Sequence, residues 1–122
     1  MATLDTNAII YYLETEEAVP EVEKALSTDG PVFISVITEL ELLSSSELSE
    51  KERDDIRMIL DTVVIVPVDS QIAHAAATLR RDYNIKTPDS IIAATALFTN
   101  TNLLTRNVKD FKNIKPLNII EI

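Results

Sequence analysis

Four acidic side chains lie where separate segments of the chain begin or end. Asp5 ends the short apolar run at the start of the sequence, and Glu41 lies in a predicted helix that follows a buried strand. Asp89 opens a strongly apolar helix, and Asp110 lies in a loop after the predicted strand 102–105. Because strand ends and helix starts of a parallel sheet gather at one edge, we expect these carboxylates to converge.

A cluster of four carboxylates needs a cation to be stable. Two carboxylates about 5 Å apart repel each other by about 3 kcal/mol at an effective dielectric constant near 20. Oxygen ligands suit hard divalent cations, so such a cluster predicts a site for Mg²⁺ or Mn²⁺.

Each of the four positions also has a purely structural explanation. Asp5 and Asp89 are ordinary residues for the start of a helix, where they cap it or interact with its dipole. Glu41 could pack its stem and keep its charge in water, and Glu39 could then be the inward residue. Asp110 could be a solvated loop charge. The recurrence of acids at the same edge of four segments favours the functional explanation.

The elements that would position these acids alternate between strands and helices. The predicted strands are the run that ends at Asp5 and residues 32–36, 62–68, 102–105 and 117–122. The predicted helices cover about residues 8–13, 21–27, 37–43, 51–60, 70–79 and 88–97, with turns at 28–31 and 84–86 and a loop at 106–112. This alternation predicts an α/β sandwich with a mostly parallel sheet.

Apolar residues at helical spacing predict how three of these helices are oriented. The sets are Ile37, Leu40 and Leu43, then Ile56, Ile59 and Leu60, then Ile72, Ala75, Ala76 and Leu79. Thr87 is predicted to cap the last long helix, with Pro88 at its first helical position.

Composition excludes several kinds of chemistry. The 122 residues contain no cysteine and a single histidine, His74, which excludes thiol catalysis, thiolate zinc sites and mechanisms with two imidazoles. The formal net charge of −9 argues against nucleic-acid binding by a broad basic surface, although a cation bound in an acidic cleft would invert the local charge. Basic residues that could steer RNA are concentrated in the second half of the chain: Arg80, Arg81, Lys86, Arg106, Lys109, Lys112 and Lys115. No apolar run of membrane-spanning length and no signal pattern occurs, so we expect one intracellular domain over residues 1–122 that does not contact a membrane.

The sequence resembles the PIN domains, and most closely the VapC-type toxins of prokaryotic toxin–antitoxin pairs. Four blocks carry the resemblance in chain order: Leu4–Asn7, Ile34–Leu43, Pro88–Leu97 and Leu103–Phe111. Together they span nearly the whole chain. The resemblance implies a three-layer α/β/α sandwich with a central, mostly parallel sheet.

The resemblance also implies a set of site residues. Carried over by position, the acidic ligands of Mg²⁺ or Mn²⁺ would be Asp5, Glu41, Asp89 and Asp110, with polar support from Thr6, Asn7, Thr105 and Asn107. The family often has a glycine shortly after the second acid, whereas Ser44, Ser45 and Ser46 follow here, so Glu39 stays an alternative at that position. Asn107 likewise stays an alternative to Asp110.

By the same resemblance, the expected activity is that of a metal-dependent endoribonuclease, the toxin of a type II toxin–antitoxin pair. The cation would activate a water for attack on an RNA phosphodiester and leave 3′-hydroxyl and 5′-phosphate ends. The implied partners are an antitoxin, which inserts a basic side chain among the carboxylates, and a second copy of the chain in a cytoplasmic homodimer.

Two other classes of function compete with this reading. A degenerate PIN fold could serve only to bind RNA or protein. A receiver-like domain or a phosphate hydrolase with an Asp nucleophile is less consistent with the sequence, because the first strand ends in a single acid and Asn7 stands where an Asp-x-Asp motif needs its second aspartate.

Overall fold

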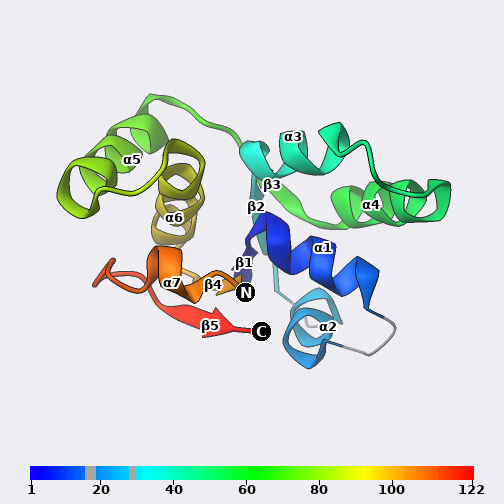
Figure 1. Cartoon of the computed structure of the whole chain (residues 1–122). Coiled ribbons are helices and arrows are strands. Elements are labelled where there is room, and N and C mark those ends of the chain that lie inside the picture. Colours follow the sequence, from blue (N-terminus) through cyan, green and yellow to red (C-terminus); the bar gives the residue numbers. More distant parts are fainter. Residues whose placement is uncertain (16–18, 28–29) are drawn as a thin grey trace.

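The computed structural model describes residues 1–15, 19–27 and 30–122. Its elements alternate between helix and strand along most of the chain (Figure 1). In chain order they are β1 (Ala2–Leu4), α1 (Thr6–Glu14), α2 (Pro20–Ser27), β2 (Val32–Ser35), α3 (Val36–Ser44), α4 (Glu50–Thr62), β3 (Val64–Val66), α5 (Ser70–Tyr83), α6 (Thr87–Thr99), β4 (Asn102–Thr105), α7 (Val108–Phe111) and β5 (Ile119–Glu121).

The described strands form one sheet of five strands in the order β3-β2-β1-β4-β5. All four neighbouring pairs are parallel, and in the central pair Leu4 aligns with Leu104. Parallel pairing requires a crossover between successive strands, which the intervening helices provide. The predicted parallel sheet is therefore confirmed.

Helices cover both faces of the sheet, which gives the three-layer sandwich expected from the resemblance (Figure 1). One core lies under α5, α6 and α7, where Leu103 and Phe111 are fully buried. The other lies under α1 to α4 and includes Leu4 and Leu104. Leu103 and Leu104 face opposite cores because successive side chains of a strand point to opposite faces of the sheet.

The sheet reverses its strand order between β1 and β4, the point where open α/β sheets form their ligand crevices. Asp5 directly follows β1, and Thr105 is the last residue of β4. The amide of Asp5 also bonds to the carbonyl of Leu104, at 3.0 Å. This topology puts the first predicted acid at the expected crevice.

Most predicted boundaries differ from the observed ones by a few residues, as in the last strand, Ile119–Glu121 rather than 117–122, and two differences have a clear cause. The third strand is only Val64–Val66 rather than 62–68, because α4 continues through Thr62, whose hydroxyl bonds to the carbonyl of Met58 at 2.9 Å. The segment 106–112, predicted as a loop, contains the short helix α7, which the buried side chain of Phe111 anchors in the core.

Some predicted helix contacts also differ. Leu40 and Leu43 share helical spacing but are exposed, because α3 buries Thr38 and Leu42 instead. Ala75 is exposed as well, while Ile72, Ala76 and Leu79 form the buried face of α5 as expected. A further set, Ile56, Ile59 and Leu60, packs into the core as predicted.

The start of α6 lies one residue earlier than predicted. Thr87 is the first helical residue rather than the cap, because the amide of Ser90 already bonds to the carbonyl of Lys86 at 2.9 Å. The predicted turn at 28–31 falls partly on residues 28–29, outside the described residues. None of the described helices is long and apolar enough to cross a bilayer.

Candidate active site

Asp5 is a buried carboxylate at the carboxyl edge of the sheet. Its backbone is the N-cap of α1, and its Oδ1 accepts a hydrogen bond from the amide of Thr6 at 2.8 Å. Only 4% of the residue is exposed. A side chain can cap a helix while it stays exposed to water, so capping does not explain why this carboxylate is buried. Burial of a carboxylate is costly and therefore needs another explanation.

Thr105 holds the second oxygen of Asp5 from the neighbouring strand. The buried hydroxyl of Thr105 donates to Asp5 Oδ2 at 2.7 Å and accepts from the amide of Asn107 at 2.9 Å. Asn7 Oδ1 lies 3.4 Å from both Thr105 Oγ1 and the amide of Arg106, so α1 and the end of β4 are tied together. Of the residues predicted as polar support, Thr105 and Asn7 contribute side chains here, whereas Asn107 contributes only its backbone amide.

Thr6, the fourth supporting residue, connects α1 to α3. Its hydroxyl donates to Glu41 Oε1 at 2.7 Å and lies 3.0 Å from the hydroxyl of Thr38. Thr38, fully buried, was not singled out from the sequence, although its spacing of three residues from Glu41 puts both on one helix face. Among the residues that the structure describes, no such hydrogen bond reaches Glu39, so the geometry favours Glu41 as the second acid.

Asp89 and Asp110, the other two predicted acids, line one cavity and interact electrostatically. Burial raises the pKa of Asp89, the charge of Asp110 raises it further, the charge of Lys86 lowers it and that of Glu41 raises it. Asp110 lies exposed on α7, and Asn107 precedes that helix with its side chain also exposed. Because the charge of Asp110 acts on Asp89, the structure favours Asp110 over Asn107 as the fourth residue of the site.

The electrostatics centre on Asp5. The pKa of its carboxyl group is raised from the ordinary 3.8 to about 6, chiefly by burial. Hydrogen bonds from Thr105 and Thr6 lower the pKa and so offset part of this rise. The negative charges of Asp89 and Glu41 raise it further. A strongly raised carboxyl pKa at a strand edge is a mark of a functional site.

The donor set fits a hard divalent cation. Its candidate ligands are carboxylate oxygens, with threonine hydroxyls beside them and no sulfur or imidazole. Across residues 1–15, 19–27 and 30–122, however, no three acidic or histidine side chains are close enough to hold a metal ion as they stand. Of the four predicted acids, Glu41 and Asp110 are exposed, whereas Asp5 is buried and Asp89 is partly buried.

Tyr11 and Arg106 add a feature that sequence reasoning missed. The guanidinium of Arg106 lies 3.7 Å from the centroid of the Tyr11 ring, a cation–π contact beside the carboxylates. In the described part of the chain, this guanidinium forms no ion pair. In a protein with 20 acidic and 11 basic residues, that leaves a positive charge available at the edge of the site.

Fold and site together define an α/β/α domain with a carboxylate cluster at the switch point of a parallel sheet. The PIN domain family matches residues 2–116, and the chain belongs to this family. The resemblance found in the sequence is thereby confirmed.

Full-length relatives agree. The chain is 29% identical to Ribonuclease VapC10 of Mycobacterium tuberculosis over 96% of this chain and 90% of that protein. It is 31% identical to Ribonuclease VapC1 of Rickettsia felis over 81% and 82% of the two chains. Among solved structures, it is similar to the toxin–antitoxin complex from Klebsiella pneumoniae, with 34% identity, a TM-score of 0.76 and complete coverage of both chains.

Proposed function

We propose that this PIN domain is a VapC-type endoribonuclease, the toxin of a type II toxin–antitoxin pair. The observation that carries the proposal is the buried carboxylate of Asp5 at the β1–β4 switch point, fixed by Thr6 and Thr105 and facing the charges of Asp89 and Glu41. The relatives named ribonucleases support the same activity.

Asp5, Glu41, Asp89 and Asp110 would hold Mg²⁺ or Mn²⁺. Such a cation, when bound, activates water and stabilises charge on a phosphodiester. The protein's part is to orient the ligands: Thr105 fixes the carboxylate plane of Asp5, and Thr6 holds Glu41. Outer hydrogen bonds of this kind usually change metal affinity or activity about 10–100-fold.

The strand order argues against a receiver domain. Receiver-type folds have the order 2-1-3-4-5, whereas this sheet has the order 3-2-1-4-5. Asp5 is also poorly placed as a phosphate-accepting nucleophile, because both of its oxygens are engaged and the residue is buried.

We propose that the protein acts in the cytoplasm and that an antitoxin binds at the edge of the sheet that carries the carboxylates. A basic side chain inserted there would meet the charges of Asp5, Glu41 and Asp89, which already repel one another. The proposal draws on the similar Klebsiella pneumoniae protein, whose structure is a toxin–antitoxin complex.

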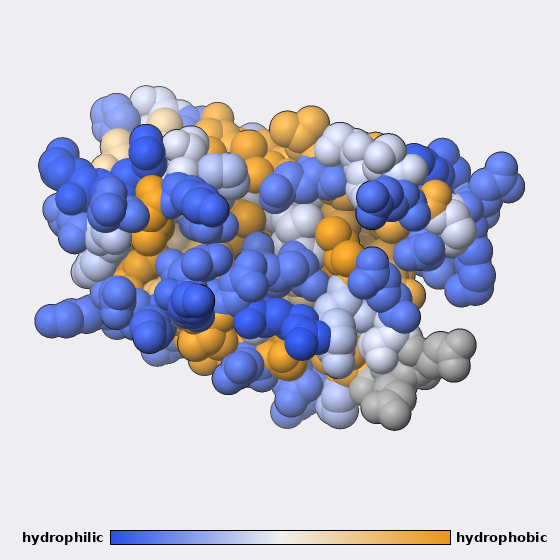
Figure 2. Space-filling model, in the orientation of Figure 1, coloured by the Kyte–Doolittle hydropathy of each residue, from blue (hydrophilic) through white to orange (hydrophobic). Residues whose placement is uncertain are grey.

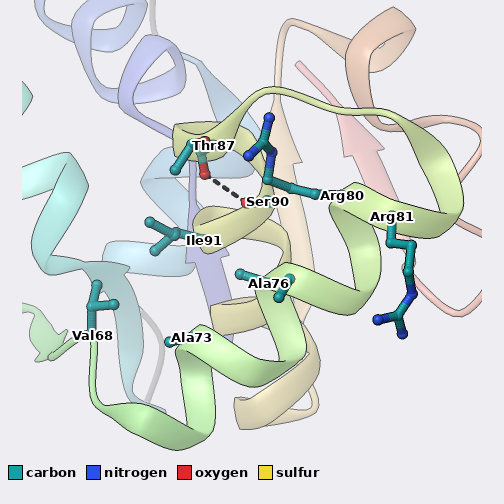
Figure 3. Close-up of a pocket in the computed structure, with 9 residues that line it drawn as sticks. Val68, Ala73, Ala76, Arg80, Arg81, Thr87, Ser90 and Ile91 are labelled. Carbon is teal, nitrogen blue, oxygen red and sulfur yellow. Dashed lines mark hydrogen bonds between the residues drawn. The ribbon is translucent and has the colours of Figure 1, made fainter.

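A second copy of the chain is the proposed partner of an apolar face between α5 and α3. A groove of about 490 Å³ runs along α5 and α6 and is lined by Val68, Ala77 and Ile91 among others, with Arg80 and Arg81 at its end (Figure 3). The exposed leucines of α3, Leu40 and Leu43, lie on the neighbouring helix. Figure 2 shows apolar side chains at the top of the molecule, in the region between the positions of α5 and α3 in Figure 1.

Two-fold symmetry would bring this face against itself, so that leucines of one protomer cover the groove of the other. Analytical ultracentrifugation tests the dimer. We expect Leu43→Lys to sediment as a monomer, and Met58→Lys, at an exposed apolar position on α4, to sediment like the parent protein. A dimer that survives Leu43→Lys with unchanged affinity would rule out this face.

Cleavage of a fluorescent mixed-sequence RNA tests the activity itself. We expect cutting with Mn²⁺ or Mg²⁺, none with EDTA, and products with 3′-hydroxyl and 5′-phosphate ends. Asp5→Asn should remove cleavage, whereas Asp61→Asn, which neutralises an exposed carboxylate on α4, should leave it unchanged.

The same experiment separates the alternatives. RNA binding without cleavage, by a protein that binds metal, would favour the binding-only PIN domain. Stable labelling by acetyl phosphate, with no RNA cleavage, would favour phosphate chemistry at an aspartate instead.

A further inference from the structure

A polar cavity lies between the α5–α6 turn and α7, beside Asp89 and Asp110. Its volume is about 240 Å³, and it is lined by Tyr83, Lys86, Asp89, Lys109 and Asp110 among others. Asp89 and Asp110 belong to the candidate active site as well. The cavity is therefore continuous with the site rather than a separate pocket.

The α5–α6 turn forms one wall of the cavity, and its backbone is firmly held. Asn84 ends α5 in the left-handed conformation, with φ of 54°, and its amide bonds to the carbonyl of Arg80 at 2.9 Å. The Arg80 side chain then donates from Nε to the carbonyl of Ile85 at 3.1 Å. Tyr83 and Ile85 pack against the core, so this wall is preformed.

Helix α7 forms the opposite wall. Phe111 is fully buried and anchors the helix, while Lys109, Asp110 and the following Asn113 are exposed at the cavity. The amide of Asp110 bonds to the carbonyl of Asn107 at 3.0 Å, which links this wall to the end of β4.

Two lysines of the cavity could bind a phosphate group once a divalent cation neutralises the carboxylates of Asp89 and Asp110, which line the same cavity. Lys86 and Lys109 contribute two ammonium groups from opposite walls. Neither forms an ion pair in the described residues, where the ion pairs found join Lys51 to Asp55, Arg57 to Asp54 and Arg81 to Asp82. Both charges are thus available to a ligand, in a chain whose net charge is −9.

The remaining lining suits a base. Tyr83 is only half-buried and offers an aromatic surface, and single-stranded RNA is commonly bound by stacking of bases on such rings. The side chains of Asn84 and Asn113 add amide donors and acceptors. The volume lies below the roughly 300–1,000 Å³ of pockets for drug-sized ligands, which suits a single nucleotide.

We propose that this cavity binds one nucleotide of the RNA strand next to the scissile phosphate, with Lys86 and Lys109 on its phosphate and Tyr83 stacked on its base. The inference rests on the proposed ribonuclease function. The competing explanation is that both lysines only neutralise the carboxylates.

Nucleotide titrations followed by amide NMR of the ¹⁵N-labelled chain in Mg²⁺ test the proposal without any need for cleavage. The probes are AMP, ribose 5-phosphate and inorganic phosphate. We expect saturable shifts from AMP at residues 83–86 and 109–113, weaker binding of ribose 5-phosphate at the same place, and the weakest binding of inorganic phosphate.

Variants divide the site into its two parts. Lys109→Ala should weaken AMP and ribose 5-phosphate about tenfold each, as expected for loss of a charged hydrogen bond. Tyr83→Leu should weaken AMP about tenfold and leave ribose 5-phosphate unchanged, because leucine keeps an apolar side chain against the core and removes the aromatic ring. Lys24→Ala, an exposed lysine on α2, is the matched control and should change neither.

Several results would overturn the proposal: no AMP shifts at these residues, equal affinity for AMP and inorganic phosphate, or Lys109→Ala and Lys86→Ala both binding AMP as the parent does. RNA cleavage by a chain that fails the AMP test would reject the cavity and keep the nuclease. AMP binding by a chain that cuts no RNA would keep the nucleotide site and reject the nuclease.

Discussion

Asp5→Asn should stabilise the metal-free protein, although it removes the central acid of the site. Most substitutions of a buried, hydrogen-bonded residue destabilise a fold. Here the carboxylate is held among other carboxylates, and its burial and their charges raise its pKa to about 6. An amide of the same shape removes the charge and keeps the space filled.

The hydrogen bonds around position 5 can adapt to the amide. The amide oxygen can still accept from Thr6, as Asp5 Oδ1 does at 2.8 Å. The new NH₂ group can donate to Thr105 Oγ1, whose own proton can then turn to Asn7 Oδ1, 3.4 Å away. The donors and acceptors already present around Asp5 keep their partners, so the remaining cost is the second N–H of the new NH₂ group, and the electrostatic gain must exceed it.

The magnitude follows from the pKa. Each unit of pKa difference between folded and unfolded states corresponds to about 1.4 kcal/mol. A rise from 3.8 to about 6 therefore amounts to about 3 kcal/mol of destabilisation when Asp5 is fully ionised. For a chain of this size, each kcal/mol corresponds to about 4 °C in Tm, so the full effect is about 12 °C.

The pH dependence gives the sign. Because the pKa of Asp5 is higher in the folded state, the folded protein binds more protons than the unfolded chain between pH 4 and 6. The contribution of Asp5 to the free energy of unfolding is therefore most favourable below pH 4, and it becomes less favourable as the pH rises from 4 to 6. The advantage of Asp5→Asn should be about 1 kcal/mol at pH 4.5, a third of its full value, and complete by pH 7.5.

Thermal melts in EDTA at these two pH values measure the effect, with Asp61→Asn as the control for loss of an exposed charge. Adding Mn²⁺ should raise the Tm of the parent protein and leave that of Asp5→Asn nearly unchanged, since a ligand of the folded state alone stabilises it. A variant that melts no higher than the parent at pH 7.5, or that gains equally at both pH values, would refute the reasoning.

Three further outcomes follow from the same contacts. Thr105→Val removes a buried donor to Asp5 and should cost about 1–3 kcal/mol in urea unfolding, with the pKa of Asp5 rising further; equal stability would show that this bond is dispensable. Glu41→Gln should lower kcat/KM for RNA cleavage by roughly 10–100-fold or more, whereas Glu39→Gln should change it less than about threefold, and the reverse order would assign the second acid to Glu39. His74→Ala should leave cleavage nearly intact because the imidazole is exposed on α5, and a large loss in a folded variant would contradict the carboxylate mechanism.

The position of the acids could be predicted because it depends on chain order and on parallel strands alone. An apolar run that stops at Asp5, and another that stops at Thr105, place both residues at one edge whatever the details of packing. The same logic gave the α/β class and the parallel sheet. Both could be predicted because the spacing of apolar residues and the residues that cap helices are visible in short stretches of the sequence.

The hydroxyl network and the exposed leucines could not be predicted from the sequence in the same way. Only the family resemblance pointed to Thr105, and Thr38 looks like an ordinary helix residue, because the roles of both depend on which segments lie beside them in space. The spacing of Leu40 and Leu43 fits a helix, yet packing selected Thr38 and Leu42 for the core. Local spacing defines a helical face but does not say which face the neighbouring elements will cover.

A repulsive carboxylate cluster also links the proposed activity to its inhibition. A divalent cation and a basic side chain of an antitoxin would relieve the same repulsion between Asp5, Asp89 and Glu41, so each should stabilise the folded chain and exclude the other. Because Asp5→Asn has already removed part of that repulsion, the variant should bind both ligands more weakly. A metal-free toxin should therefore bind its antitoxin more tightly than a metal-loaded one, and calorimetric titration with and without Mn²⁺ would measure the difference. Equal affinities under the two conditions would mean that the antitoxin acts away from the carboxylates.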